Sequence, residues 1–173
     1  MGTREIRRGV FEFLKTLAVA FVLAQLIMTS VAQAFQVEQY SMEPNLLPHD
    51  RVLVNKFIYR FRMPRPGEII VLHPPIAPSR NYIKRVVAVA GQTVRIHGGH
   101  VYLDGRVLPE PYLRIETAGE YGPKVVPPGD VFVLGDNRGN SEDSRAFGFV
   151  PVRSIVGEAV LIYWPPQRVR VLQ

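Results

Sequence analysis

An uncharged, mostly apolar run from Thr16 to Phe35 separates a basic N-terminus from the rest of the chain. A helix rises about 1.5 Å per residue, so a run of about 20 residues is long enough to cross the hydrocarbon of a bilayer. The basic residues before the run are Arg4, Arg7, Arg8 and Lys15. Because basic flanks stay in the cytoplasm, the pattern predicts a single-pass protein of the cytoplasmic (inner) membrane. We expect a short cytoplasmic N-terminus over residues 1–15, a transmembrane anchor helix over 16–35 and an extracytoplasmic, β-rich domain over 36–173.

A cleaved secretory signal is the alternative interpretation of this run. The triplet Ala32-Gln33-Ala34 matches the small-residue pattern of a signal cleavage site. However, the run is long for the apolar region of such a signal, and cleavage would place the new N-terminus at Phe35. A buried core helix fits less well, because a helix that is apolar all round suits lipid. We therefore favour a retained anchor in contact with membrane lipid.

The chain beyond Val37 carries short β-type runs separated by glycine and proline turn signals. With 47% hydrophobic and 21% charged residues, it can build a core. The dipeptides Gly98-Gly99 and Asp104-Gly105 suit tight hairpin turns. This spacing predicts an all-β fold, a compact antiparallel and partly open barrel or sandwich. The proline-rich stretches 74–78 and 123–128 are expected to be ordered surface loops. The expected strands are Arg51–Val54, Glu68–Leu72, Tyr82–Val89, Thr93–His97, His100–Leu103, Val131–Leu134 and Ile155–Tyr163.

Several classes of site and partner are disfavoured by composition. The chain has no cysteine, which excludes disulfides, thiolate metal sites and a cysteine nucleophile. The net charge is +6, but the basic residues are scattered, so we expect no nucleic acid partner. His97 and His100 flank a hairpin turn, and two ligands without a third make a weak metal site. We expect no metal, no cofactor and a monomer.

Lys84 lies beside Arg85 inside a run that is otherwise mostly apolar, Tyr82–Val89. Alternation along a strand places Lys84 on one face and Arg85 on the other, so one of the two must face an apolar side. Arginine cannot lose its proton, whereas a desolvated lysine can, and a neutral lysine is a general base. The alternative is an edge-strand lysine that extends its amine to water. Lys15, Lys56, Lys84 and Lys124 are the only lysines, and Lys84 alone sits in a long β-branched strand.

Ser41 follows the apolar run directly, in Ser41-Met42-Glu43-Pro44. A serine hydroxyl is a poor nucleophile until a base takes its proton, so Ser41 and Lys84 are candidate partners. A turn serine before a proline-rich loop is the alternative. The loop from Gly135 to Arg145 offers hydroxyls and carboxylates that can orient a base. The amide of Gln39 is a candidate donor to a developing oxyanion.

These stretches together resemble the bacterial type I signal peptidases, which use a serine–lysine dyad. The resemblance covers residues 10–164 and follows the family order. It runs from the anchor through S-M-x-P and "RVLV" followed by Lys56. It continues through "RPGEIIVL", "YIKRVVAVAGQTV" and "GDNRGNSEDSRAFG". One such stretch alone is modestly specific for the family, but all of them in this order are highly specific for it.

The resemblance implies that Ser41 is the nucleophile and Lys84 the general base of a serine endopeptidase. It implies that Ser141 helps to position the lysine and that the backbone N–H of Ser41 and the side chain of Gln39 form the oxyanion hole. Supporting charged residues would be Asp143, Arg145, Asp136 and Arg138. Residues near the substrate groove would be Phe35, Val37, Met42, Leu46, Tyr82 and Ile83. The implied substrates are the signal peptides of secreted preproteins, bound as extended strands and cut after small residues in an A-x-A pattern.

Some residues depart from the family pattern. Gln39 stands where the family often has a small hydroxyl residue, and Tyr40 where it usually has a small residue. Asn45 replaces a frequent threonine, and His49 a frequent glycine. These departures concern the oxyanion donor and the pockets rather than the dyad.

Two rival functions remain at this stage. A self-cleaving repressor uses similar dyad chemistry, but no DNA-binding domain precedes Ser41. A membrane-tethered β-domain that only binds or assembles partners is the rival from a different class. Lys84 discriminates between them, because a binding module tolerates glutamine or arginine at that position.

Overall fold

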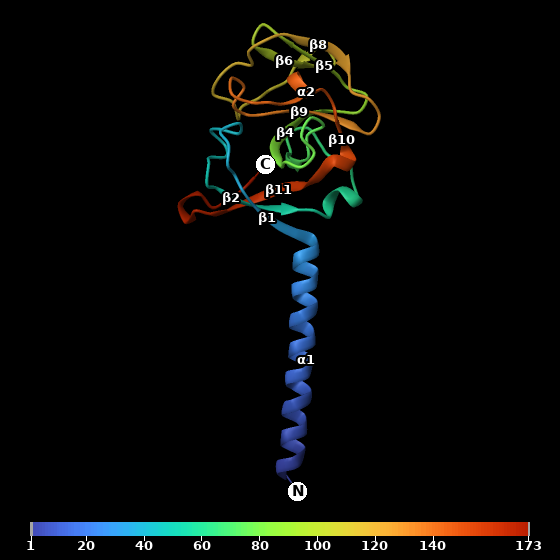
Figure 1. Ribbon diagram of the computed structural model, residues 1–173, viewed down its shortest axis with the longest axis vertical. Coiled ribbons are helices and arrows are strands. Elements are labelled where there is room, and N and C mark those ends of the chain that lie inside the picture. Colours follow the sequence, from blue (N-terminus) through green and yellow to red (C-terminus); the bar gives the residue numbers. More distant parts are fainter. Residues whose placement is uncertain (1, 173) are drawn as a thin grey trace.

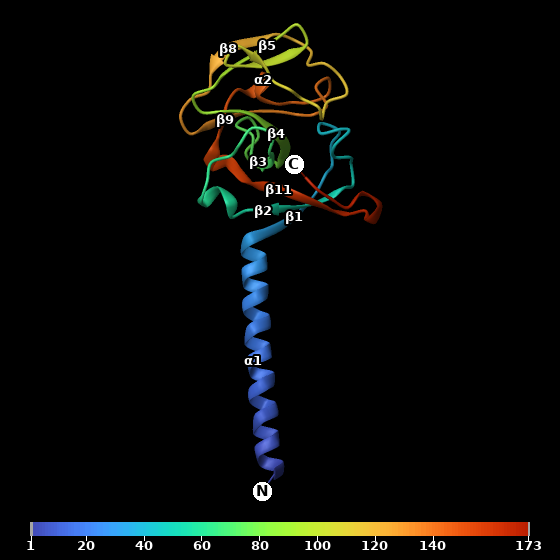
Figure 2. The same ribbon diagram turned by 180° about the vertical axis from the view of Figure 1, so that it is seen from behind.

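A computed structural model describes the backbone of residues 2–172, with side chains described for residues 7–23, 25 and 31–172. A long helix, α1 (Gly2–Val31), projects from a body built mostly of β-strands. Figures 1 and 2 show this body as two stacked sheets seen from opposite sides, with the N-terminus at the far end of α1. The protein is therefore mostly β, as the sequence predicts.

The larger sheet holds eight strands in the order β1-β2-β11-β3-β4-β9-β10, with β12 paired to β11. All its pairs are antiparallel, and the sheet curls into a half-barrel. Its strands are β1 (Ala32–Gln36), β2 (Arg51–Asn55), β3 (Ile69–Leu72), β4 (Tyr82–Val89), β9 (Asp130–Leu134), β10 (Val150–Pro151), β11 (Ile155–Trp164) and β12 (Arg170–Val171).

The smaller sheet is a four-stranded antiparallel layer in the order β7-β6-β5-β8. It comprises β5 (Thr93–His97), β6 (His100–Leu103), β7 (Arg106–Val107) and β8 (Tyr121–Val125). Short helical turns connect the strands: η1 (Ile58–Arg60), α2 (Ser144–Phe147), η2 (Val152–Ser154) and η3 (Pro166–Arg168). Asp143 caps α2 by accepting a hydrogen bond from the backbone N–H of Arg145.

The boundaries of the predicted anchor helix are wrong at its C-terminal end. The helix stops at Val31, and Ala32–Gln36 form β1, where Phe35 lies opposite Val52 of β2. Pairing with β2 overrides the helical tendency of this apolar stretch, because tertiary context decides the state of short segments. The side chains of residues 24 and 26–30 lie outside the described part of the chain. Within the described residues, no helix is apolar over the length that a membrane span requires, so the predicted single-pass topology is not confirmed.

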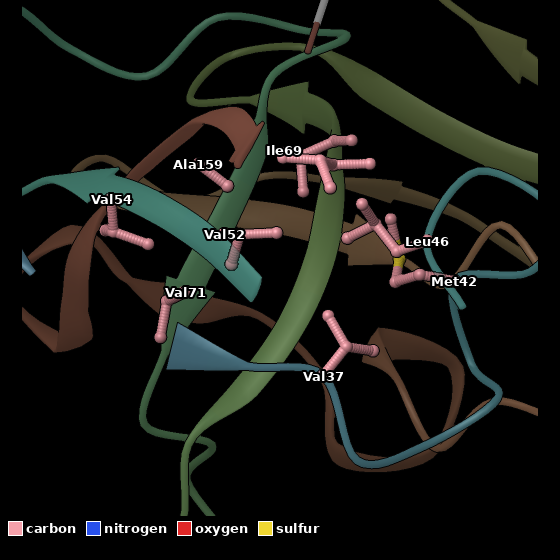
Figure 3. Close-up of a cluster of buried hydrophobic side chains, with 9 residues drawn as sticks. Val37, Met42, Leu46, Val52, Val54, Ile69, Val71 and Ala159 are labelled. Carbon is pink, nitrogen blue, oxygen red and sulfur yellow. The ribbon is translucent and has the colours of Figure 1, made fainter. Parts of the chain in front are cut away.

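Three clusters of buried side chains form the core, and one of them supports the loop between β1 and β2. Val37, Met42 and Leu46 from this loop point into the cluster beside Val52 and Ile69 (Figure 3). Met42 and Leu46 are at most 1% exposed. The loop between β1 and β2 is therefore fixed to the half-barrel by apolar side chains on both sides of its midpoint.

Candidate active site

Two elements far apart in the sequence bring Ser41 and Lys84 together. Ser41 lies in the loop of residues 37–50 between β1 and β2, here called the nucleophile loop, and Lys84 is the third residue of β4. The Nζ atom of Lys84 donates a hydrogen bond of 2.8 Å to the Oγ atom of Ser41. Both residues are buried, with 1% of Lys84 and 8% of Ser41 exposed. This distance is within reach for direct proton transfer.

The surroundings of Lys84 favour its neutral form. Burial removes water from the amine and lowers its pKa from 10.5 to about 8. The carboxylates of Asp143, Glu142 and Asp136 act in the opposite direction and keep the pKa from falling further. The amine also donates to the carbonyl oxygen of Ile83 at 3.1 Å. A substantial fraction of Lys84 is therefore neutral near physiological pH.

The neighbouring Arg85 is buried as well, with only 3% exposed. Its guanidinium donates two hydrogen bonds, of 2.9 and 2.7 Å, to the carboxylate of Asp136. The alternation of β4 requires at least one of its two cations to face an apolar side. The structure buries both, because Arg85 has a bidentate anionic partner, whereas the amine of Lys84 meets a hydroxyl and a carbonyl.

The loop from Gly135 to Arg145 contacts the main chain of Ser41 through Asn137 and is held by buried charges. Asp143 accepts a hydrogen bond from the N–H of Gly135 and pairs with Arg145 at 2.9 Å. Arg138, only 1% exposed, donates to Gly135 O, Glu110 and Thr117. These contacts fix the loop that faces the nucleophile.

Ser141, the hydroxyl expected to position the lysine, occupies the same loop. Its Oγ atom is buried and has no hydrogen-bond partner among the described residues. A Cβ added at Gly135 would overlap both this hydroxyl and the carbonyl oxygen of Ser41, so Ser141 and Ser41 flank Gly135. A buried hydroxyl without a partner is unusual in a folded protein. The role of Ser141 toward Lys84 stays a prediction.

A groove of about 470 Å³ leads to Ser41. One wall is the end of β1 and the start of the nucleophile loop, and the other is residues 80–83 at the start of β4. Of the six expected groove residues, all but Leu46 line it, and Leu46 is fully buried in the core. Gln39 lines the groove and has an exposed side chain. The groove-lining residues are Ala34, Phe35, Gln36, Val37, Glu38, Gln39, Ser41, Met42, Arg80, Asn81, Tyr82 and Ile83.

Sequence reasoning missed the polar contacts that Tyr82 and Asn45 make. Tyr82 donates a hydrogen bond of 2.6 Å from its hydroxyl to Glu142, which joins β4 to the Gly135–Arg145 loop. Asn45 donates to Asp136 at 2.8 Å and to the carbonyl oxygen of Tyr112 at 3.0 Å. Asn45 was noted only as a departure from a pattern, and that departure was the available signal.

The sequence matches the model of one protein family, described as signal peptidase, peptidase S26, over residues 10–164. A signal peptidase I from Leptolyngbya laminosa is 43% identical over 166 residues, which cover 92% of this chain and 82% of that protein. A probable signal peptidase I-2 from Synechocystis is 43% identical over 166 residues, covering 93% and 76% respectively.

A solved structure is similar as well. The crystal structure of a signal peptidase I from Enterococcus faecalis is 30% identical to this chain, with a TM-score of 0.51. The similarity covers 56% of this chain and 97% of that chain.

Proposed function

We propose a mechanism from the premise that this chain belongs to the signal peptidase family, peptidase S26. Membership makes it a serine endopeptidase that removes signal peptides. The proposal assigns Ser41 as the nucleophile and Lys84 as its general base. The observation that carries it is the 2.8 Å hydrogen bond between two buried side chains at the end of a groove.

In the first step, neutral Lys84 accepts the proton of the Ser41 hydroxyl. The Oγ atom attacks the carbonyl carbon of the scissile peptide bond, and the proton then passes from Lys84 to the leaving amine. An acyl-enzyme remains on Ser41 and the mature protein leaves. Lys84 next takes a proton from a water molecule, whose oxygen attacks the acyl carbon. The bond between this carbon and Oγ then breaks, the proton passes from Lys84 to Oγ, and the signal peptide leaves. The same amine thus serves in both half-reactions.

The developing oxyanion requires donors beside Ser41. We assign the backbone N–H of Ser41 and the side-chain amide of Gln39 to this role. Gln39 is exposed in the groove, and its amide carries N–H donors on a flexible side chain.

The groove suits an extended peptide. Strand β9 pairs with β4 only from Arg85 onward, and β1 is the last strand of the larger sheet, so both walls of the groove belong to sheet edges within the described chain. A peptide between them gains main-chain hydrogen bonds. The side chains of Phe35, Val37 and Ile83 line the groove beside such a peptide. They leave little space there, so the groove favours a substrate with small residues in an A-x-A pattern.

We further propose that α1 associates the enzyme with a membrane. Its described residues carry apolar side chains that are more than half exposed, and arginines precede them. The exposed apolar side chains are Val10, Phe11, Phe13, Leu14, Leu17, Val19, Phe21, Val22 and Leu23. Lipid provides cover for such a surface, and attachment places Ser41 near substrates held at the same membrane.

The proposal is tested by cleavage of a preprotein with the purified full-length chain. Ser41→Ala and Lys84→Ala each remove one partner of the proton transfer, so each lowers kcat by at least about 10³-fold. Lys84→Arg fails to the same extent, because arginine keeps the charge but cannot accept a proton.

Lys124→Ala is the matched control, since Lys124 lies on β8 of the smaller sheet, away from the groove, and its loss leaves activity unchanged. Circular dichroism checks that each variant is folded. Turnover retained by a folded Ser41→Ala or Lys84→Ala variant contradicts the assignment.

A further inference from the structure

The nucleophile loop has no regular secondary structure of its own. Main-chain hydrogen bonds close its base, where Val37 N–H donates to Asp50 O and His49 N–H donates to Val37 O, both at 2.8 Å. Between these ends the loop makes only short turns. The position of Ser41 therefore depends on contacts that other segments make with the loop.

One set of contacts comes from the Gly135–Arg145 loop. The N–H of Asn137 donates to the carbonyl oxygen of Ser41 at 3.0 Å, and its side chain donates to Tyr40 O at 3.1 Å. The side chain of Asn45 donates to Asp136. This side of the nucleophile loop is thus tied to residues already assigned to the active site.

A second set comes from the last residues of the chain. Arg168 binds both carboxylate oxygens of Asp50, from Nε at 2.7 Å and from Nη2 at 2.9 Å. The same carboxylate accepts the N–H of Leu47 at 2.9 Å. Arg168 and Arg170 also donate to the main-chain carbonyl oxygen of Asn45. The red C-terminal turn and the cyan nucleophile loop lie side by side in both views (Figures 1 and 2).

Asn45 is consequently held from two directions. Its main chain accepts from the two C-terminal arginines, and its side chain donates to Asp136, which is itself bound by Arg85. Arg85 adjoins Lys84 on β4. The polar contacts therefore form a continuous connection from the C-terminus through the nucleophile loop to the strand that carries the base.

We propose that Arg168 and Arg170 are positioning residues that hold the nucleophile loop so that Ser41 meets Lys84 at proton-transfer distance. The inference rests on the proposed function of that pair. Bidentate arginine–carboxylate contacts are directional as well as strong, which suits them to fix a loop. Displacement of a catalytic group by about 1 Å lowers a rate by about 10²-fold, so a modest shift of the loop is sufficient to impair catalysis.

The C-terminal segment does not need these arginines to stay in place. Strand β12 pairs with β11, where Val171 lies opposite Leu161, and Leu172 N–H donates to Val160 O at 2.9 Å. Leu172 also packs against the core cluster that contains Met42 and Leu46. Removing an arginine side chain therefore leaves the segment attached while it removes polar contacts from the nucleophile loop.

The test compares kcat and KM for preprotein cleavage by the full-length chain and its variants. We expect the double variant Arg168→Ala/Arg170→Ala to lose at least about tenfold in kcat and to change KM by less than that, because β1 and residues 80–83, which form the rest of the groove lining, do not contact these arginines. Arg168→Lys retains one contact with the Asp50 carboxylate but not the second hydrogen bond of the guanidinium. Its kcat therefore falls between those of wild type and Arg168→Ala.

Arg62→Ala is the matched control. Arg62 has a 25% exposed side chain and binds Glu68 and Glu158, much as the 29% exposed Arg168 binds Asp50, but it does not contact the nucleophile loop. We expect its kcat to match wild type. Equal losses in Arg62→Ala and in the variants of Arg168 and Arg170 overturn the inference, since they indicate a general effect of ion pairs.

Arg170→Ala keeps the test decisive if loss of Arg168 unfolds the protein by leaving Asp50 buried without a partner. Arg170 is exposed, and its side chain donates to Asn45 O, so this variant folds and loses several-fold in kcat. Wild-type kcat in folded Arg170→Ala and Arg168→Lys overturns the inference alone. Turnover by Ser41→Ala overturns the proposed function instead, whatever the arginine variants do.

Discussion

Lys84 combines two properties that rarely occur in one lysine: it is buried, and its hydrogen-bond partners within the described chain are a hydroxyl and a carbonyl rather than a carboxylate. Burial lowers the pKa of the amine, and the more distant carboxylates limit the decrease. A base with a pKa of about 8 is neutral often enough to act near neutral pH and still basic enough to take a serine proton. The pKa of Lys84 is therefore set by burial and by carboxylates at a distance, and not by a carboxylate bonded to the amine.

The pH dependence of cleavage follows from this pKa. Only neutral Lys84 accepts a proton, and its neutral fraction rises with pH. We expect kcat/KM to increase about tenfold per pH unit below the pKa and to level off above about pH 8. The measurement is kcat/KM for preprotein cleavage between about pH 6 and about pH 10. The reference pKa values of aspartate, glutamate and arginine lie outside this range, so these groups do not titrate within it.

Glu142→Gln provides the control for this profile. The charge of Glu142 raises the pKa of Lys84, so removing it moves the midpoint of the profile to lower pH, while the amide oxygen can still accept the Tyr82 hydroxyl. A midpoint near 10.5, the ordinary value for lysine, or one that does not respond to this change, argues against Lys84 as the titrating base.

Residue types predicted the pairing of Ser41 with Lys84, which the structure places 2.8 Å apart, but not the residues that support the pair. Lys84 was identifiable because a lone lysine in a β-branched strand conflicts with its surroundings. Asn45 and Arg168 show no such conflict, since their types are ordinary in surface loops. Their partners lie 91 and 118 residues away in the sequence, and only the fold brings them together.

At the scale of elements, strand prediction succeeded where the side-chain pattern was strong. Strand β4 has the predicted bounds, as do β5 and β6. Strand β8 includes residues 123–125 of the proline-rich stretch 123–128, for which the sequence predicts a surface loop. It lies at the edge of its sheet, where a proline does not interrupt a ladder between two neighbours. Strand β1 was assigned to the anchor, because its apolar residues continue the preceding run.

The junction between β9 and the following loop requires a residue without a side chain. Gly135 lies where any Cβ would overlap the Ser41 carbonyl and the Ser141 hydroxyl. We expect Gly135→Ala to push the nucleophile loop away from β9 and to lower kcat by at least about 10²-fold. The overpacking also destabilises the fold by about 1–3 kcal/mol, measured by chemical denaturation.

Gly139→Ala, in the same loop, is the matched control. The nearest atom to its added Cβ is the Cδ1 of Ile115 at 3.9 Å, an ordinary contact. Its stability stays within about 0.5 kcal/mol of wild type, and its kcat is unchanged. Equal effects at the two glycines would show that loop flexibility, and not the close approach, is what matters.

At the scale of the whole molecule, α1 and the β-body have contrasting surfaces. The body buries most of its apolar side chains in three clusters, whereas the described part of α1 leaves its phenylalanines about two-thirds exposed. Phe11, Phe13 and Phe21 are between 64% and 67% exposed. Burial of each such side chain in lipid contributes about 1.5–3 kcal/mol.

Vesicle flotation tests membrane association at this scale. We expect the full-length chain to float with vesicles that contain anionic phospholipid. The triple change of Phe11, Phe13 and Phe21 to serine reduces the bound fraction by more than about tenfold, because apolar burial is lost. Phe61→Ser, at a residue 75% exposed on the β-body, serves as the control and leaves binding unchanged. Equal binding by the triple variant refutes association through α1.

The direct passage from α1 into β1 has a consequence for substrate choice. The helix ends at Val31, the strand begins at Ala32, and the N–H of Lys56 donates to Val31 O at 2.9 Å, so no hinge separates the two elements. Strand β1 then continues into the groove wall at Ala34. An enzyme attached to a membrane through this helix holds its groove at a fixed distance from the lipid. Peptide bonds at other distances from the membrane are then not cleaved, even where the neighbouring residues are small.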